Sequence, residues 1–170
     1  TSSVIVALGN EKAKSWLSGL KNNLARKPQG NDRAQVKAIF NGICQFAIIN
    51  HYYMAKMLTD NKQKEWAESV KVIFPNQNDR GVHMNVSGMG LAKYAPNKKN
   101  AIELMNFLGS FEGQKIYAQR NNEYPVNSAV ELNPLQKKWG NFQMDTVHLS
   151  EIALNRSKAI KLTDEVGYNN

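Results

Sequence analysis

Apolar side chains recur every three or four residues in several parts of the chain, a spacing that places them on one face of an α-helix. The clearest stripe lies within residues 10–24 and consists of Ala13, Trp16, Leu17 and Leu20. Further helices are predicted in the segments that begin at Asp32 and after Asn50, and at residues 97–108, 111–119, 135–139 and 150–166. Residues 1–8 have no initiator Met and no basic leader and resemble the middle of a helix, so we expect the chain to be part of a longer protein.

Some of these helices carry recognisable signals at their ends. Asp32 followed by Gln35 resembles a capping box at a helix start, and Gly42 stands where a glycine commonly ends a helix. Asn50 is a plausible N-cap for the helix that follows it.

Three other segments have patterns that are typical of strands. Residues 43–49 form an almost continuous apolar run, which predicts a strand covered on both faces. Residues 70–74 predict a second short strand, and residues 82–93 predict an extended segment punctuated by glycines. Because helices and strands alternate along the chain, we predict the fold class α/β.

The composition excludes several classes of protein. A chain of 170 residues fits one domain or two small lobes, and a hydrophobic content of 42% excludes a disordered chain. The single cysteine, Cys44, excludes an internal disulfide framework and a multi-cysteine zinc site. The sequence has no nucleophile elbow, no phosphate-binding glycine loop and no His-Glu-x-x-His motif, so we expect a protein that is not an enzyme.

The net charge of +8 raises the alternative of a nucleic-acid-binding domain. The basic residues are dispersed, however: the longest runs are pairs, and 17 of the 22 are Lys, which is the less specific partner of phosphate. We therefore expect a solvated positive surface and no nucleic-acid partner. The alternative remains open, and it predicts retention on DNA that depends steeply on salt.

The most unusual group of residues is Asn50-His51-Tyr52-Tyr53, directly after the predicted strand 43–49. Ligands of open α/β sheets gather at the carboxyl ends of strands. A helix capped by Asn50 would carry both tyrosines in its first turn, where the helix dipole favours negative charge. Phenols ionise near pH 10, so only a hard, highly charged cation would hold them as phenolates at neutral pH, and Fe(III) is such a cation. The alternative is that both tyrosines are amphipathic packing residues.

The segment from Arg26 to Tyr53, which ends with the tyrosine pair, resembles the ferric-ion-binding proteins of ABC-type iron importers, which are bacterial periplasmic solute-binding proteins. The resemblance extends over essentially the whole chain, with its motifs in the same order. The further motifs are Phe74-Pro75-Asn76-Gln77, residues 81–88, Ala95-Pro96-Asn97-Lys98, Glu123-Tyr124-Pro125-Val126-Asn127 and Asp164-Glu165-Val166-Gly167.

The resemblance implies a type II periplasmic-binding-protein fold, in which two α/β lobes joined by hinge strands hold Fe(III) in the cleft between them. It implies that Tyr52 and Tyr53 are metal ligands. Asn31 and Asn50 match positions near a synergistic anion, carbonate or phosphate, in some members, although both are also ordinary loop and cap residues. Lys56 lies one turn beyond Tyr53, where it could add a charge near the site or be simply solvated.

The family layout also implies how the chain is divided. Residues 1–81 and 131–170 would belong to the carboxy-terminal lobe, and residues 82–130 would cross the hinge and complete the amino-terminal lobe. The expected partners are the missing amino-terminal half of the same protein and an ABC-type permease in the inner membrane, and the expected location is the periplasm. The alternative is a solute-binding protein of the same fold for another small ligand.

Overall fold

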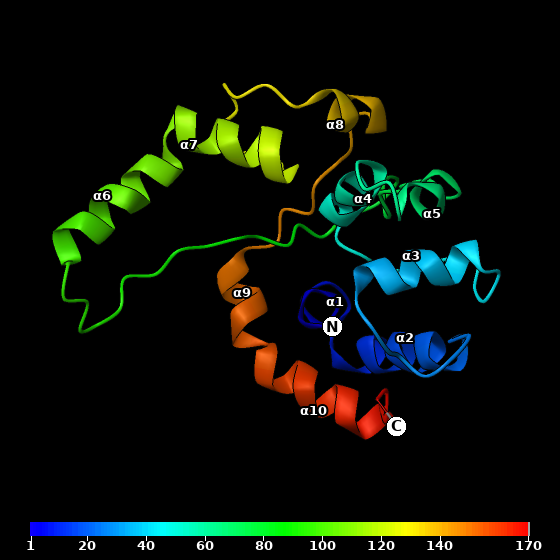
Figure 1. Ribbon diagram of the computed structural model, residues 1–170. Coiled ribbons are helices and arrows are strands. Elements are labelled where there is room, and N and C mark those ends of the chain that lie inside the picture. The colour runs from blue at the N-terminus through cyan, green and yellow to red at the C-terminus, as the bar shows by residue number, and fades with distance from the viewer. Residues whose placement is uncertain (170) are drawn as a thin grey trace.

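The computed structural model describes residues 1–169 and is built from helices joined by long irregular segments (Figure 1). Within this range the helices are α1 Ser2–Leu8, α2 Asn10–Asn22, α3 Asp32–Phe40, α4 His51–Leu58, α5 Lys64–Glu68, α6 Lys98–Gly109, α7 Phe111–Ile116, the π-helical turn η1 Tyr117–Asn121, α8 Pro134–Trp139, α9 Leu149–Leu154 and α10 Arg156–Val166.

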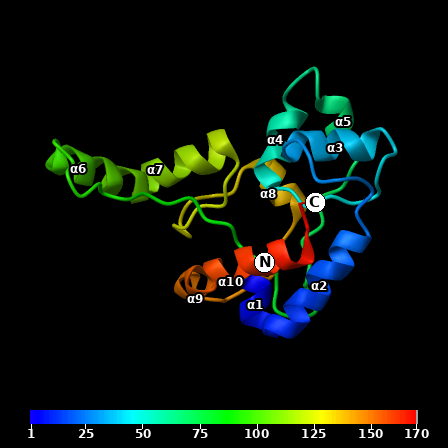
Figure 2. The ribbon, with the colours of Figure 1, turned by 90° about the horizontal axis from the view of Figure 1, so that it is seen from below.

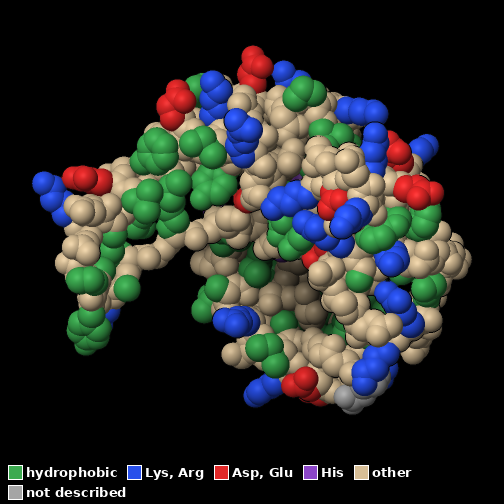
Figure 3. Space-filling model, viewed as in Figure 1, with side chains coloured by type: hydrophobic (Ala, Val, Ile, Leu, Met, Phe, Trp, Pro, Cys, Tyr) green, Lys and Arg blue, Asp and Glu red, His purple; other side chains and the backbone are tan. Residues whose placement is uncertain are grey.

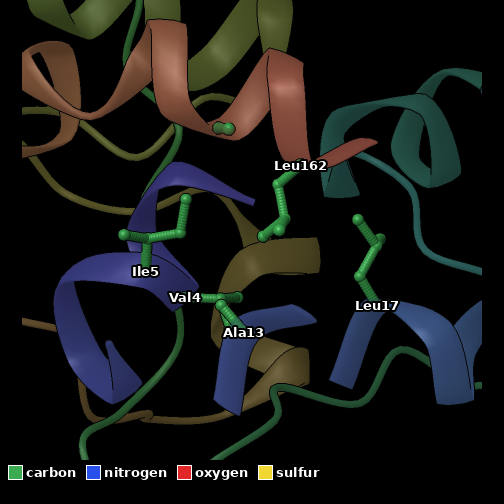
Figure 4. Packing of buried hydrophobic residues seen from close by; sticks show 6 residues of the cluster. Val4, Ile5, Ala13, Leu17 and Leu162 are labelled. Atoms are coloured by element: carbon green, nitrogen blue, oxygen red, sulfur yellow. The ribbon is translucent and has the colours of Figure 1, made fainter. Parts of the chain in front are cut away.

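The two ends of the chain share one hydrophobic core. In this core α1 and α2 pack against α10, so the first and last helices lie side by side (Figure 4). The buried residues are Val4, Ile5, Ala13, Leu17, Ala159 and Leu162. The predicted stripe of the second helix is therefore the face that packs, although Trp16 at its edge stays 41% exposed.

A second hydrophobic core holds α3, α4 and α5 together. Its buried residues are Val36, Met54, Met57 and Ala67, and Tyr53 packs against them from the side. Met57 is completely buried, which fixes the α4 helix on its neighbours. The second core therefore fixes the position of α4, whose first turn carries Tyr52 and Tyr53.

The helices α6 and α7 and the turn η1 form an arm that extends away from the two cores in both views (Figures 1 and 2). None of the α6 residues is buried, although the helix is amphipathic. The large apolar side chains Ile102, Leu104, Phe107, Phe111 and Ile116 are 42–56% exposed. Figure 3 shows hydrophobic side chains gathered over this arm. An exposed apolar surface of this kind is uncommon on a soluble monomer.

The segment that leads to the arm touches the segment between α8 and α9 next to Gly81. Val82 and Met144 form an isolated parallel bridge. Beside it the Arg80 guanidinium donates to Asp145 Oδ2 at 2.8 Å, and the Asp145 side chain is only 4% exposed. The backbone bridge and the ion pair together hold these two segments against each other.

The predicted strands at 43–49, 70–74 and 82–93 do not form a sheet in residues 1–169. In this range the Val82–Met144 contact is an isolated bridge outside any strand. A strand needs a neighbour to bond its N–H and C=O groups, and the described residues do not supply one. Several apolar side chains of these segments stay exposed as a consequence: Phe46 is 85%, Ile48 80% and Ile73 76% exposed. Others, such as Ile49, Val70 and Val72, pack against the second core.

The predicted helices are confirmed, with three differences. Residues 150–166 form two helices, α9 and α10, that meet at Asn155. Residues 111–119 begin as α7 but widen into the π-helical turn η1. The short helix α5 was not predicted, because five residues are too few to display a helical period.

Candidate functional site

The first turn of α4 is held in place by the carboxylate of Asp32, at the start of α3. Asp32 Oδ1 accepts from the Asn50 backbone N–H at 2.7 Å and from Asn50 Nδ2 at 3.1 Å. The side-chain oxygen of Asn50 in turn accepts from Asn85 Nδ2 at 3.0 Å. Asn50 is therefore the N-cap residue by position, as predicted, but its side chain bonds to other segments rather than capping its own helix.

Tyr52 and Tyr53 lie with their rings against each other. The ring centroids are 4.5 Å apart and the planes differ by 33°. A hydrogen bond to the Tyr53 hydroxyl, together with burial and the charges of Asp32 and Glu123, raises the pKa of Tyr52 to about 12. The Tyr52 phenol consequently keeps its proton at neutral pH unless a cation displaces it.

Two cationic side chains lie over the tyrosine rings. Lys56 Nζ is 5.2 Å from the centroid of Tyr52, and Arg33 Cζ is 5.9 Å from the centroid of Tyr53. Lys56 is thus beside the pair, in the place that its spacing in the helix predicts. These are cation–π contacts, in which each positive charge lies over the face of a tyrosine ring.

Asn31 has a structural task at the start of α3. Its Oδ1 accepts from the Ala34 backbone N–H at 3.1 Å, so Asn31 is the N-cap of α3. The predicted capping box from Asp32 to Gln35 is wrong, because Asn31 is the N-cap and the side chain of Asp32 turns to Asn50 instead. It is Asp32, and not Asn31, that the structure brings into contact with the first turn of α4.

His51 and Tyr124 lie beside the tyrosine pair, and no pattern in the sequence singled out a role for either. Their rings are 4.9 Å apart, and the His51 ring also meets Tyr52 edge-on with a centroid distance of 6.1 Å. Burial lowers the pKa of His51 and raises the pKa of Tyr124 to about 12. The Tyr124 hydroxyl is buried without a hydrogen-bond partner in the described residues. The signal available in the sequence was that both residues belong to the matched motifs.

The side-chain atoms of Tyr52 and Tyr53 that could bind a metal ion are phenol oxygens. In residues 1–169 there is no group of three or more His, Cys, Asp and Glu side chains that could hold a metal ion. Oxygen donors that become anionic suit a hard trivalent cation better than Zn²⁺ or Cu⁺.

Within residues 1–169 no helix is long and apolar enough to cross a membrane.

Comparison with known protein families decides the class of the protein. Residues 5–144 match the family model described as "Bacterial extracellular solute-binding protein". The chain belongs to this family. The match covers most of the chain, including α4, the arm and the segments that lead to it.

The names of several relatives of this solute-binding protein refer to iron. The chain is 42% identical to iron uptake protein A1 of Synechocystis over 168 residues, which is 98% of the chain and 47% of that protein. The solved structure of the apo ferric ion-binding protein A of Pasteurella haemolytica superposes with a TM-score of 0.96 at 48% identity, covering 99% of the chain and 53% of that structure. A Trichodesmium protein in complex with iron and citrate ligands superposes with a TM-score of 0.92 at 41% identity, covering 98% and 54%.

The predicted family and fold class are confirmed by these similarities. The structural neighbours have the type II periplasmic-binding-protein fold, and this solute-binding protein superposes on one part of it along nearly its whole length. The chain spans about half the length of the relatives it matches. The α/β class is therefore a property of the family, while the described residues carry its helices and the unpaired segments at strand positions.

Proposed function

We propose that the protein binds Fe(III) through the phenolate oxygens of Tyr52 and Tyr53 and delivers it to an ABC-type permease from the periplasm, without catalysing a reaction. The observation that carries this proposal is the contact of the two tyrosine rings on the first turn of α4. Ionising two adjacent phenols is unfavourable in the absence of a cation, because the two negative charges repel each other. A bound Fe(III) would offset that repulsion.

The positive side chains beside the tyrosines support a small anion next to the proposed cation. Lys56 and Arg33 lie over the two rings, and the amide of Asn50 lies at the start of the same helix. Two phenolates leave an octahedral Fe(III) with open positions, which carbonate, phosphate or groups from elsewhere in the protein would fill. The names of the relatives, which refer to iron uptake and ferric iron binding, support the same ion.

The first test is a titration of the natural, full-length protein with chelated Fe(III) at neutral pH in bicarbonate. We expect a visible charge-transfer band from phenolate to iron that saturates at one iron per protein. The absence of colour, together with unchanged unfolding behaviour in the presence of Fe(III), would contradict the proposal. It would favour a solute-binding protein of the same fold for another small ligand.

Iron binding is also expected to release protons, because a phenol that coordinates must lose its hydrogen. The pKa of Tyr52 of about 12 means that this phenol is protonated in the metal-free protein throughout the neutral range. Two phenols that each lose a proton make the affinity rise with pH, by up to about a hundredfold per unit between pH 6 and pH 8. Acidification would correspondingly favour iron release.

Calorimetry in two buffers of different ionisation enthalpy measures this release. The chelator takes up protons of its own as it gives up iron, so its contribution is measured separately, by transferring Fe(III) from the same chelator to a second chelator of known proton release, and is subtracted. A difference of zero protons would show that the phenols do not ionise on binding.

We further propose that residues 1–81 and 131–170 belong to one lobe and that residues 82–130 extend into the other. The exposed apolar face of α6 and α7 supports this division, because it needs a covering surface that residues 1–169 do not provide. Closure of the two lobes around the ion would be the functional motion.

This division predicts that the 170-residue chain by itself exposes the arm and associates, whereas the full-length protein is monomeric. Sedimentation and denaturant unfolding of both proteins compare them directly. A sharp, two-state transition of the isolated chain as a monomer would contradict the division.

A further inference from the structure

The segment that carries the arm touches the first turn of α4 both where it leaves and where it returns. On the outgoing side, Asn85 Nδ2 donates to Asn50 Oδ1 at 3.0 Å. On the returning side, the His51 ring nitrogen Nε2 bonds to the backbone oxygen of Asn122 at 2.9 Å. Residues 50 and 51 directly precede the tyrosine pair, so both contacts act on the helical turn that presents the phenols.

The outgoing and returning segments are also joined to each other. Ser87 Oγ donates to Glu123 Oε2 at 2.9 Å. Asn85 and Ser87 therefore lie beside Asn122 and Glu123 near α4. The arm is attached to the site helix through these two adjacent stretches of chain.

The returning contact is the more strongly built of the two. Asn122 has a left-handed backbone with φ of 60°, and it ends the π-helical turn η1. Its backbone oxygen accepts from the completely buried Gln136 at 3.2 Å as well as bonding to His51. Its side-chain oxygen accepts from Asn133 Nδ2 at 2.8 Å. The Asn122 carbonyl is thus a fixed point between η1, α8 and α4.

We propose that His51 is a positioning residue, which uses its Nε2–H to hold the tyrosine-bearing turn of α4 on the Asn122 carbonyl and so couples the position of the phenols to that of the arm. The inference rests on the proposed function in so far as the phenols bind iron. The bond requires the tautomer with hydrogen on Nε2, because a carbonyl oxygen accepts but does not donate. The edge-on contact with Tyr52 and the tilted contact with Tyr124 set the plane of the ring so that Nε2 faces Asn122.

Two substitutions separate the hydrogen bond from the ring. His51→Phe keeps an aromatic ring beside Tyr52 and Tyr124 but removes the donor. His51→Gln removes the ring but offers an amide N–H at nearly the same reach as Nε2. His148→Phe is the matched control, because His148 is exposed and its side chain makes no cap bond on α9.

The primary measurement is amide hydrogen exchange in the metal-free, full-length protein. The reporter amides are those of Tyr53, which bonds to the Asn50 carbonyl, and Glu123, which bonds to the Tyr117 carbonyl. We expect His51→Phe to speed exchange of both amides by roughly fivefold to tenfold, the factor that one lost hydrogen bond supplies. We expect His51→Gln to restore protection and His148→Phe to leave it unchanged.

Two results would overturn the proposal. Unchanged exchange in His51→Phe would show that the bond does not hold the turn, and equal acceleration in His51→Phe and His51→Gln would show that ring packing holds it instead. The Fe(III) titration of the same variants is the second readout, in which affinity is expected to fall in His51→Phe and recover in His51→Gln. A wild-type protein that gives no iron band refutes the proposed function, while the exchange comparison still decides the role of His51 in either direction.

Discussion

Changing Tyr52 and Tyr53 together to Phe is expected to abolish the phenolate–iron band, and each single change is expected to weaken Fe(III) binding by at least about a hundredfold. Alterations of residues that only support metal ligands already cost about 10- to 100-fold in affinity, so loss of a ligand oxygen should cost more. Each substitution removes one hydroxyl and keeps the ring, so the 4.5 Å contact between the rings can persist. Optical titration against a competing chelator measures the affinities.

The control for this prediction is Tyr94→Phe. Tyr94 is 84% exposed and lies beside Lys93, so it resembles the pair of Tyr52 and Lys56 in chemistry but not in setting. Its substitution should leave the band and the affinity unchanged. Wild-type affinity in both single variants at Tyr52 and Tyr53 would remove these residues from the iron site.

Replacing Gly81 by Ala is expected to lower the stability of the protein strongly. Gly81 is buried with φ of +88°, a backbone conformation that disfavours a side chain. A Cβ there would stand 2.7 Å from the backbone oxygen of Gln143 and 2.7 Å from the carbonyl carbon of Met144. Backbone atoms cannot rotate aside as a side chain can. The contact of Val82 with Met144 would therefore have to open, at a cost of about 2–4 kcal/mol in the free energy of unfolding.

Two other glycines separate the causes of this loss. Gly140 has a similar φ of +84° but open space around its Cβ position, so Gly140→Ala measures backbone strain without the clash. Gly88 has neither problem, and Gly88→Ala should be nearly neutral. Denaturant unfolding of the full-length variants should rank the losses as Gly81 first, Gly140 second and Gly88 last. A loss of stability at Gly81 no larger than the loss at Gly140 would show that the backbone of residues 143–144 moves away from the added Cβ at little cost.

The helices were predictable because their signals are local. Residues 13, 16, 17 and 20 repeat at the helical period, and this period is complete within one turn or two. The strand positions were recognisable from their apolar runs, but strand pairing depends on a neighbour that is often far away in sequence. For that reason the patterns at 43–49 and 70–74 gave the fold class of the family and not the hydrogen bonding of the described residues.

The tyrosine pair was predictable because its members are adjacent in the sequence, and the family was predictable because its motifs keep their order. The position of Lys56 followed in the same way from the spacing of an α-helix. The residues that hold the pair could not be found from the sequence. Asp32 and Asn122 reach the first turn of α4 from 18 and 71 residues away, through bonds to Asn50 and His51.

By itself the sequence determined the helices with a clear apolar period, the adjacent pair of phenols and the family, since these follow from neighbouring residues or from the order of short motifs along the chain. Only the tertiary structure decided which oxygen holds the start of α4, that Asn31 caps a helix, and that the arm is tied to the site on both sides. Those bonds join segments whose separation in sequence is large and whose side chains are common polar types. A hydrogen bond acts over about 3 Å, so it exists only after packing has brought its two partners together.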